Sequence, residues 1–449
     1  MSPMTEPAIS AELAAAASPA VAPVTAAERI SSLDTLRGVA LLGILLMNIV
    51  SFGLPGGAYM DPTVAGGASG LNLAAWLINQ VWFEGKMRAI FSMLFGAGVV
   101  ILTARAEERG GAAHVADIYY RRNLWLLLFG LLHAYLIWVG DILYPYALAG
   151  LFLYPFRKQS PKFLILAGLL LLATLSPKYY MMGLELRELE QQVRAAEADQ
   201  KAGKPLTDDQ KEAQKNWAEQ KKDFKPDPPE VEKEIKDHRG SYATLLARRA
   251  KSVVGWQTIF YYHFGFFDVA GMMLLGMGLL KLGVFSATRS YRFYWLLVIL
   301  GYGIGAPLNC WVGQWRIRSN FDFPGMWTAF STGDPGRLTV ALGHIGLVML
   351  VCKAGLLGWL TRPLAAVGQM ALSNYLATSL IATTLFYGHG FGLFGQLQRY
   401  QLYLVVLGVW VFNLAASPIW LRHFRFGPFE WLWRSLTYWE RQAMRLTGA

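Results

Sequence analysis

Long apolar runs, each flanked by charged residues, recur along most of the chain. Most of these runs are about twenty residues long, which is the length that an α-helix needs to cross the hydrocarbon core of a membrane. The short alternating segments typical of a transmembrane β-barrel do not occur. The pattern predicts an all-α polytopic membrane protein with about ten transmembrane helices, further interfacial helices and a charged helical insert outside the bilayer.

The positions of the apolar runs define the predicted spans. Two of them form a hairpin within residues 121–156. The run at 71–83 is too short to cross a membrane alone, so it predicts an interfacial or re-entrant helix. The other predicted spans are 37–54, 84–104, 163–182, 261–280, 294–312, 338–352, 364–387 and 403–420.

Composition divides the chain into five regions. The first 28 residues are rich in Ala, Pro and Ser without a basic residue, which predicts a disordered tail and not a signal peptide. Residues 184–240 contain 15 acidic and 12 basic side chains, a composition typical of solvated helices. The predicted regions are the tail 1–28, a membrane half 29–183, the insert with an amphipathic helix 184–255, a second membrane half 256–420 and an interfacial helix 421–449.

Lys and Arg side chains mark alternate ends of the predicted spans. If ten spans cross the bilayer, the basic loops all face the cytoplasm, both termini are cytoplasmic and the charged insert lies outside. The formal net charge of +11 is distributed over these loops and does not form one basic domain, so no nucleic-acid partner is expected. The loops concerned are 105–122, 157–162, 281–292, 353–362 and 422–434.

The hairpin from Arg121 to Phe156 contains two ionisable groups at membrane depth. His133 lies inside its first apolar run, and Asp141 follows a glycine at the corner. Such groups are costly in a bilayer and by default indicate a functional site. Two structural interpretations remain open: His133 bonding to a carbonyl of a neighbouring helix, and Asp141 capping the next helix.

Further polar side chains lie at a similar predicted depth on other spans. Glu84 and Arg88 are four residues apart, so an ion pair along one helix is an alternative to a functional role. We expect the group to line one cavity that opens to the outside, with the substrate bound by some of its members. The candidates at this depth are Asn48 in the first span, Glu84 and Arg88 in the second, and His263 and Asp268 in the sixth. The predicted substrate-binding residues are Arg88, His263 and Asp268 together with Asn374 and Tyr375 in the ninth span.

These residue types suit proton transfer at neutral pH. A histidine oriented by a carboxylate can deprotonate a hydroxyl or amine, and an amide such as that of Asn48 can donate to the oxyanion that forms at an acyl carbon. Proton-coupled transport uses the same residue types. There is no metal-ligand spacing, P-loop or dinucleotide fingerprint, and Cys310 and Cys352 are placed for neither a disulfide nor a metal site.

Several segments resemble bacterial YeiB-like membrane proteins, whose function is poorly defined. They are SLDTLRGVALLGILLMNI, FEGKMRAIFSMLFGAG, RRNLWLLLFGLLHAYLIWVGDILYPYA and, near the C-terminus, GQMALSNYLATSLIATTLFYGHGFGLFG and FRFGPFEWLWRSLTY. The resemblance implies a protein of the bacterial inner membrane. The LDxLRG opening is also similar to transmembrane acyltransferases such as the lysosomal heparan-α-glucosaminide N-acetyltransferase, which transfers acetyl from cytosolic acetyl-CoA across the membrane.

This second similarity implies roles for particular residues. Asn48 matches an asparagine implicated in the reaction, whereas Tyr59 stands where that enzyme has a histidine, and the loop 51–70 contains none. Either His133 substitutes for it, or this branch performs different chemistry. In the acyltransferase hypothesis His133 is the base, and Asp141 or Glu84 orients it. Acyl-CoA is then a co-substrate and not a tightly bound cofactor. Its phosphates are expected to bind to Arg37, Arg121 and Arg122.

Three functions therefore remain open at this point. The leading hypothesis is acyl transfer to an extracytoplasmic hydroxyl or amine on a small molecule or glycan. The second is a permease for a lipid or small solute through the same polar cavity. The third is a scaffold that docks partners through the insert. Membrane lipids are expected partners in all three, and a homo-oligomer is possible in each.

Overall fold

The computed structural model describes residues 29–108 and 114–446, so the predicted tail 1–28 lies outside the described residues. The described chain is helical and contains no β-strand. Its first half consists of α2 (Ser31–Gly53), α3 (Gly57–Met60), α4 (Gly70–Ile78), η1 (Asn79–Phe83), α5 (Lys86–Glu108), α6 (Val115–Leu136), α7 (Leu143–Leu153), η2 (Tyr154–Lys158), α8 (Pro161–Ala173) and α9 (Leu175–Lys201). Its second half consists of α10 (Asp208–Phe224), α11 (Pro228–Arg239), α12 (Tyr242–Gly255), η3 (Trp256–Gly265), α13 (Phe266–Lys281), α14 (Tyr291–Arg318), α15 (Phe323–Lys353), α16 (Gly358–Gln369), α17 (Ala371–Phe386), α18 (Arg399–His423) and α19 (Pro428–Tyr438).

The prediction of an all-α polytopic membrane protein is confirmed, but the count of ten spans is not. Among the described residues, seven helical stretches are long and apolar enough to cross a membrane, or eight if the bent pair α16–α17 is one span. The difference lies partly in the core hairpin, where α7 has only 11 residues and is about 16 Å long, half of a bilayer core. The seven stretches are α2, α4–α5, α8–α9, α12–α13, α14, α15 and α18.

Helix α2 lies at the centre of the assembly, against α5, α16, α17 and α18. Glycines permit the close crossings: a Cβ on Gly38 would collide with the backbone of α16 at Leu364. The crossing of α5 and α13 is reciprocal, because a Cβ on Gly96 would meet the Met273 carbonyl and one on Gly276 the Met93 carbonyl. The hydrophobic effect does not drive helix association in lipid. Glycines at these crossings instead let the helices approach closely and gain van der Waals contacts.

The predicted span 364–387 is not one straight helix. It breaks at Met370 into α16 and α17, which differ in direction by 87°. The start of α17 leaves backbone N–H groups without helical partners, and the Glu430 carboxylate of α19 accepts those of Leu372 (2.6 Å) and Ser373 (3.1 Å). Asn374 donates back across the break to the Val367 carbonyl. Side-chain acceptors from another helix therefore support the bend.

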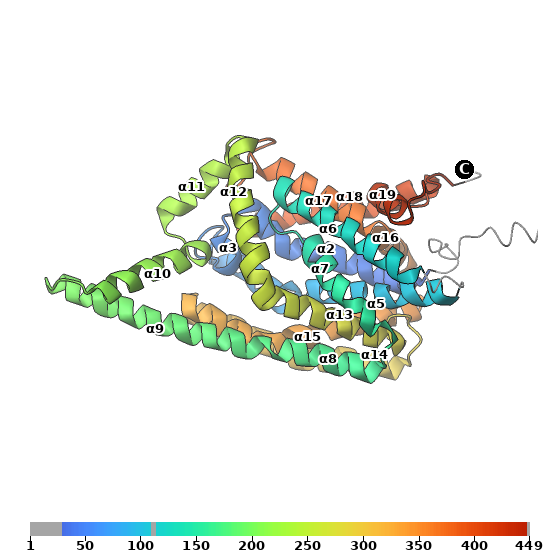
Figure 1. The fold of residues 1–449 in the computed structure, drawn as a ribbon, viewed down its shortest axis with the longest axis horizontal. Coiled ribbons are helices and arrows are strands. Elements are labelled where there is room, and N and C mark those ends of the chain that lie inside the picture. The colour runs from blue at the N-terminus through green and yellow to red at the C-terminus, as the bar shows by residue number, and fades with distance from the viewer. Residues whose placement is uncertain (1–28, 109–113, 447–449) are drawn as a thin grey trace, which may run out of the picture.

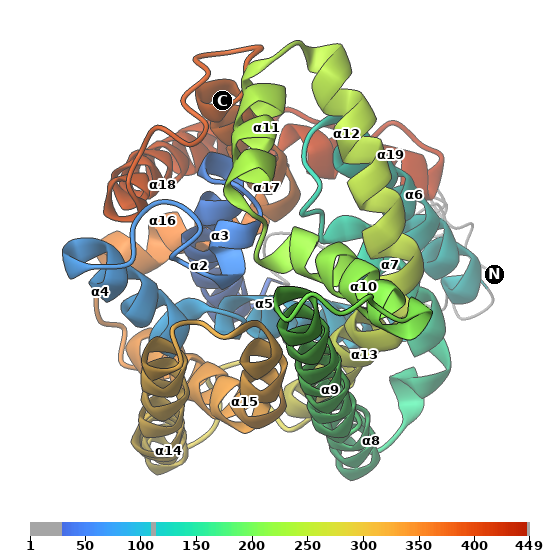
Figure 2. The same cartoon turned by 90° about the vertical axis from the view of Figure 1, so that its left-hand side faces the viewer.

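The charged insert projects from one end of the molecule, opposite to α19 (Figure 1). Its first helix, α9, runs on from the membrane part and passes the predicted boundary at residue 184 without a break. Helix α10 begins with a capping box in which Thr207 and Gln210 exchange side-chain and backbone hydrogen bonds. Figure 2, viewed from this end, places α3 and α10 in front of α5 near the centre of the assembly.

Candidate functional site

A line of three hydrogen-bonded side chains connects the core hairpin to α17. His133 Nδ1 lies 2.9 Å from Asp141 Oδ1, and His133 Nε2 lies 3.0 Å from Ser379 Oγ. Because a carboxylate only accepts, the imidazole carries its proton on Nδ1, and its Nε2 is an acceptor for the Ser379 hydroxyl, which also lies 3.2 Å from the Tyr375 carbonyl. The His133 and Asp141 side chains are 0% and 2% exposed. We call Asp141, His133 and Ser379 the relay; it has the order of contacts found in Ser–His–Asp hydrolases.

The local sequence explains two of the three positions. His133 lies in the last turn of α6, and the chain then reverses through residues 137–142 into α7. Asp141 Oδ2 accepts the Tyr144 backbone N–H at 2.7 Å, so the aspartate caps α7 with one oxygen and orients His133 with the other. Asp141 therefore binds a backbone N–H at the start of α7, as the capping interpretation predicts, and the His133 ring contacts two side chains and not a carbonyl of a neighbouring helix.

A small cavity adjoins the relay at Ser379. Its volume is about 10 Å³, and its lining includes Asn48, Trp138, Tyr375 and Thr378 besides Ser379. A void of this size holds about one water molecule. The buried indole Nε1 of Trp138 has no hydrogen-bond partner among the described residues. Two N–H donors, the Asn48 amide and the Trp138 indole, thus belong to side chains that surround the same space beside the serine.

A second group of polar side chains, the charge cluster, consists of Arg88, Asp268, Asp334 and Arg337. Arg337 binds Asp268 with two guanidinium nitrogens, at 2.5 and 3.1 Å, and contacts Asp334 at 3.0 Å. Arg88 lies 3.7 Å from the same Asp268 carboxylate. The structure therefore brings together Arg88 and Asp268, two of the predicted substrate-binding residues. It adds Arg337 and Asp334 of α15 to them.

Glu84 and Arg88 do not form the helical ion pair that their spacing allows. Helix α5 begins only at Lys86, after Gly85 with φ +74°, so Glu84 lies outside the helix and accepts the Tyr59 hydroxyl at 2.8 Å. Buried Lys86 donates to Asn309 Oδ1 at 2.8 Å. Glu84 consequently belongs beside the charge cluster, and it does not orient His133.

Two predicted substrate-binding residues contact neither group, whereas a third, Tyr375, packs against the relay. His263 is exposed on η3, with Nδ1 bonded to the Ile259 carbonyl, and Asn374 donates to Val367 and to Ser417 Oγ at the helix bend. Tyr375 packs 4.9 Å from the His133 ring, and its hydroxyl accepts the Ile142 N–H.

The three arginines expected to bind acyl-CoA lie at the α19 end of the molecule. Arg37 pairs with Asp34 at 2.8 Å, and Arg121 pairs with Asp117 and donates to the Thr437 carbonyl. Arg122 stacks on Trp433 of α19, 3.7 Å from the ring centroid. Two of the three guanidinium groups therefore already have carboxylate partners within the chain.

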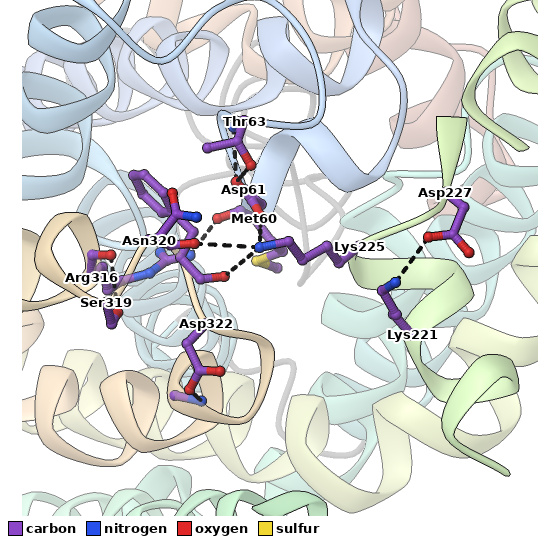
Figure 3. Close-up of polar contacts among 12 residues, drawn as sticks. Met60, Asp61, Thr63, Lys221, Lys225, Asp227, Arg316, Ser319, Asn320 and Asp322 are labelled. Atoms are coloured by element: carbon purple, nitrogen blue, oxygen red, sulfur yellow. Dashed lines mark hydrogen bonds and ion pairs between the residues drawn. The ribbon is translucent and has the colours of Figure 1, made fainter. Parts of the chain in front are cut away.

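The insert contacts the membrane part at Asp61, after the short helix α3 (Figure 3). Lys225, which follows α10, contacts Asp61 at 3.0 Å and the carbonyls of Asn320 and Phe321 at 3.4 and 3.2 Å. Asn320 and Phe321 both have positive φ, 51° and 54°, which is unfavourable for residues other than glycine. The turn between α14 and α15 thus presents its carbonyls to a lysine of the insert.

Sequence reasoning missed three residues of these two groups and also Trp138, which lines the cavity beside the relay. Ser379 lies one helical turn after Tyr375 and so shares its face, which is a signal within the SNYLATS segment. Asp334 and Arg337 are three apart in the STGDPGR segment and form an i,i+3 pair. Trp138 carries no such signal, because a tryptophan in a span is normally packing. No group of three possible metal ligands occurs among the described residues.

Comparison with known proteins gives consistent matches over nearly the whole chain. Residues 279–440 match a family model described as "Protein of unknown function (DUF418)". The chain is 34% identical to "Uncharacterized protein YeiB" of Escherichia coli over 91% of this chain and 96% of that protein. It is 31% identical to "Uncharacterized protein YxaH" of Bacillus subtilis over 93% and 96%. No solved structure matches. The chain therefore belongs to the YeiB-like family of bacterial proteins of unknown function.

Proposed function

We propose that this membrane protein transfers an acyl group from a cytosolic acyl-CoA to a hydroxyl or amine acceptor outside the cytoplasm, with the relay as its catalytic centre. The observation that carries the proposal is the line Asp141–His133–Ser379, buried within the helix assembly and adjoining a small cavity that both apolar and polar side chains line. A histidine between a carboxylate and a serine hydroxyl activates the serine as a nucleophile.

The first step forms an ester on Ser379. Its Oγ attacks the thioester carbon while its proton passes to His133 Nε2; the C–S bond then breaks, and the thiolate leaves with that proton. Asp141 keeps the other ring nitrogen protonated and stabilises the imidazolium. The Asn48 amide and the Trp138 indole N–H donate to the oxyanion, a type of interaction that contributes about 3 kcal/mol per donor.

The second step releases the acyl group to the acceptor. His133 removes the proton of the acceptor hydroxyl or amine as that group attacks the ester carbon, and Ser379 Oγ regains a proton as the ester bond breaks. A cavity of about 10 Å³ holds water but no acyl chain. Catalysis consequently requires α2 and α17, which supply Asn48 and Ser379, to separate when the donor enters.

The decisive experiment is covalent labelling of Ser379. Purified protein is incubated with acetyl-, octanoyl- or palmitoyl-CoA, and the peptide containing Ser379 is analysed by mass spectrometry. We expect an acyl adduct in the wild type, none in Ser379→Ala, and a strongly reduced yield in His133→Ala. Thr383→Ala is the matched control, because Thr383 also bonds to a backbone carbonyl of α17 but does not contact His133. Absence of an adduct with every donor, together with unchanged growth of a His133→Ala strain under conditions that require the protein, would refute the proposal.

A permease is the second candidate, and the charge cluster supports it. Charged side chains within membrane-spanning helices line substrate pathways in many transporters, and Arg88, Asp268 and Arg337 lie on α5, α13 and α15. Solute uptake into proteoliposomes without an acyl donor would favour this function over acyl transfer.

We further infer that the protein lies in the bacterial inner membrane with both termini in the cytoplasm. The supporting feature is the gathering of Arg37, Arg121 and Arg122 at the end opposite to the insert, as the bias of basic residues toward the cytoplasm requires. Single cysteines placed at residues 215 and 441 test this topology. We expect a membrane-impermeant maleimide to label the first in intact spheroplasts and the second only after lysis.

A further inference from the structure

Arg88 has an unusual environment for an arginine within a membrane helix. The residues on both sides of it, Met87 and Ala89, are 3% and 1% exposed, yet the Arg88 side chain is 41% exposed. Solvent therefore reaches this guanidinium although the surrounding helix is packed. Among the described residues, the guanidinium forms one ion pair, with Asp268 at 3.7 Å, which is beyond hydrogen-bond distance.

The other charged groups nearby have closer partners. Both oxygens of Asp268 are taken by the two nitrogens of Arg337, and Arg337 also contacts Asp334. The Glu84 carboxylate accepts the Tyr59 hydroxyl at 2.8 Å. A guanidinium has five N–H donors, and those of Arg88 have no acceptor in the described part of the chain. The free N–H donors of the Arg88 guanidinium can therefore bind a further acceptor, and the positive charge favours an anionic one.

The position also has a polar connection to the insert. Tyr59, bonded to Glu84, is two residues before Asp61, which pairs with Lys225 of the insert. In Figure 2 the insert helix α10 and the short α3, which carries Tyr59, lie in front of α5. The contacts of Lys225 with Asp61 and of Tyr59 with Glu84 therefore connect the insert with the start of α5, where Arg88 lies.

We propose that Arg88 binds the carboxylate or phosphate group of a ligand that enters from the insert side. The planar fork of a guanidinium matches the two oxygens of such groups and can bind both with parallel hydrogen bonds. Asp268 holds the guanidinium on one side without saturating it. The site is separate from the relay: it requires neither His133 nor acyl transfer, and it serves an anionic acceptor in the enzyme or an anionic solute in a permease.

Binding of simple anions to the purified full-length protein tests this site. The midpoint of thermal unfolding in detergent is measured against sodium phosphate and sodium acetate, with sodium chloride at equal ionic strength as reference. We expect a saturable rise with phosphate or acetate in the wild type, the same rise in His133→Ala, and none in Arg88→Gln. Arg194→Gln, which removes an exposed arginine of the insert, should behave as the wild type.

Arg88→Lys provides the variant that keeps the charge. It should bind at least about tenfold more weakly, because an ammonium cannot offer two parallel donors. Reconstitution into phosphatidylglycerol or phosphatidylcholine vesicles distinguishes a lipid phosphate from a soluble one: if anionic lipid alone abolishes the phosphate effect, the ligand is a lipid headgroup. Equal anion responses in the wild type and both Arg88 variants, or no anion-specific response in the wild type, would overturn the proposal.

Discussion

The relay and the charge cluster, both built from ionisable groups within membrane helices, differ in how their hydrogen-bonding capacity is used. In the relay, each nitrogen of His133 has one partner at about the ideal distance, and the side chains of His133 and Asp141 are nearly inaccessible. In the charge cluster, Arg337 and Asp268 are closely paired, whereas Arg88 beside them is solvated and weakly bound.

This difference indicates different tasks. A closed line of hydrogen bonds fixes the tautomer of His133 and the direction in which a proton moves, and this suits catalysis. A cluster with a solvated donor has room for a ligand, and this suits binding. The two groups are connected mechanically, because Tyr146 of α7 bonds to Ser92 and donates to the Arg88 carbonyl, and Asp141 caps the same helix.

The largest expected effect comes from breaking the pair that keeps the charge cluster neutral. Arg337→Gln leaves Asp268 without its two donors, and we expect a loss of about 3–5 kcal/mol of stability, as for other buried ion pairs that lose one partner. The thermal midpoint in detergent measures it. The double variant Arg337→Gln/Asp268→Asn should recover part of the loss; if single and double variants unfold together, the pair is not coupled.

The insert should lose stability at low pH because of one buried histidine. His238 of α11 stacks on Phe394 with ring centroids 4.0 Å apart. Burial lowers the pKa of His238 to about 4; the nearby Arg248 and Arg249 act in the same direction, and the bond to the Glu234 carbonyl and the nearby Asp237 oppose it. The pKa of His238 is about 6.5 in the unfolded chain and about 4 in the folded one, so between these pH values the unfolded state binds more protons. The contribution of His238 to stability is therefore complete above pH 6.5 and decreases as the pH falls to 4.

Hydrogen exchange of α11 measures this decrease, which reaches up to about 3 kcal/mol of local opening free energy at pH 4. His238→Phe retains the stack on Phe394 without a titrating group, so its protection should not change over this range. Protection of the α17 amides around Ser379 serves as the internal reference. A decrease of equal size in α11 of the phenylalanine variant would contradict the assignment to His238.

A smaller effect is expected from the relay serine. Ser379→Ala leaves the buried Nε2 of His133 without its donor, at a cost of about 1–2 kcal/mol. Thr383→Ala should cost less, because its lost bond to the Ser379 carbonyl leaves that carbonyl its helical partner. Chemical denaturation of both variants gives the comparison, and equal losses would mean that the His133–Ser379 contact contributes nothing.

The smallest effect concerns the contact that fastens the insert. Lys225→Ala removes a partly exposed ammonium from the buried Asp61 carboxylate, which keeps its bonds from the Thr63 N–H and hydroxyl, so we expect a cost of about 1 kcal/mol. We expect faster hydrogen exchange in α10 and no change in the thermal midpoint of the membrane part. Lys215→Ala, in the middle of α10, is the control, and similar exchange in both variants would exclude a fastening role for Lys225.

The sequence by itself determined the class of fold and much of the hairpin chemistry. Apolar runs of bilayer length predict helices wherever they occur, because in lipid the backbone must satisfy its own hydrogen bonds. The proximity of His133 and Asp141 was accessible too, since eight residues and a glycine corner separate them. The alternating basic loops likewise depend on local composition only.

The tertiary structure alone decided which distant residues complete each group. Ser379 lies 246 residues from His133, and Arg337 lies 69 residues from Asp268. A hydropathy pattern gives the depth of a side chain, but its direction around the helix axis relative to other helices depends on packing. For the same reason the bend at Met370 escaped prediction: its stability comes from the Glu430 carboxylate, about sixty residues further along the chain.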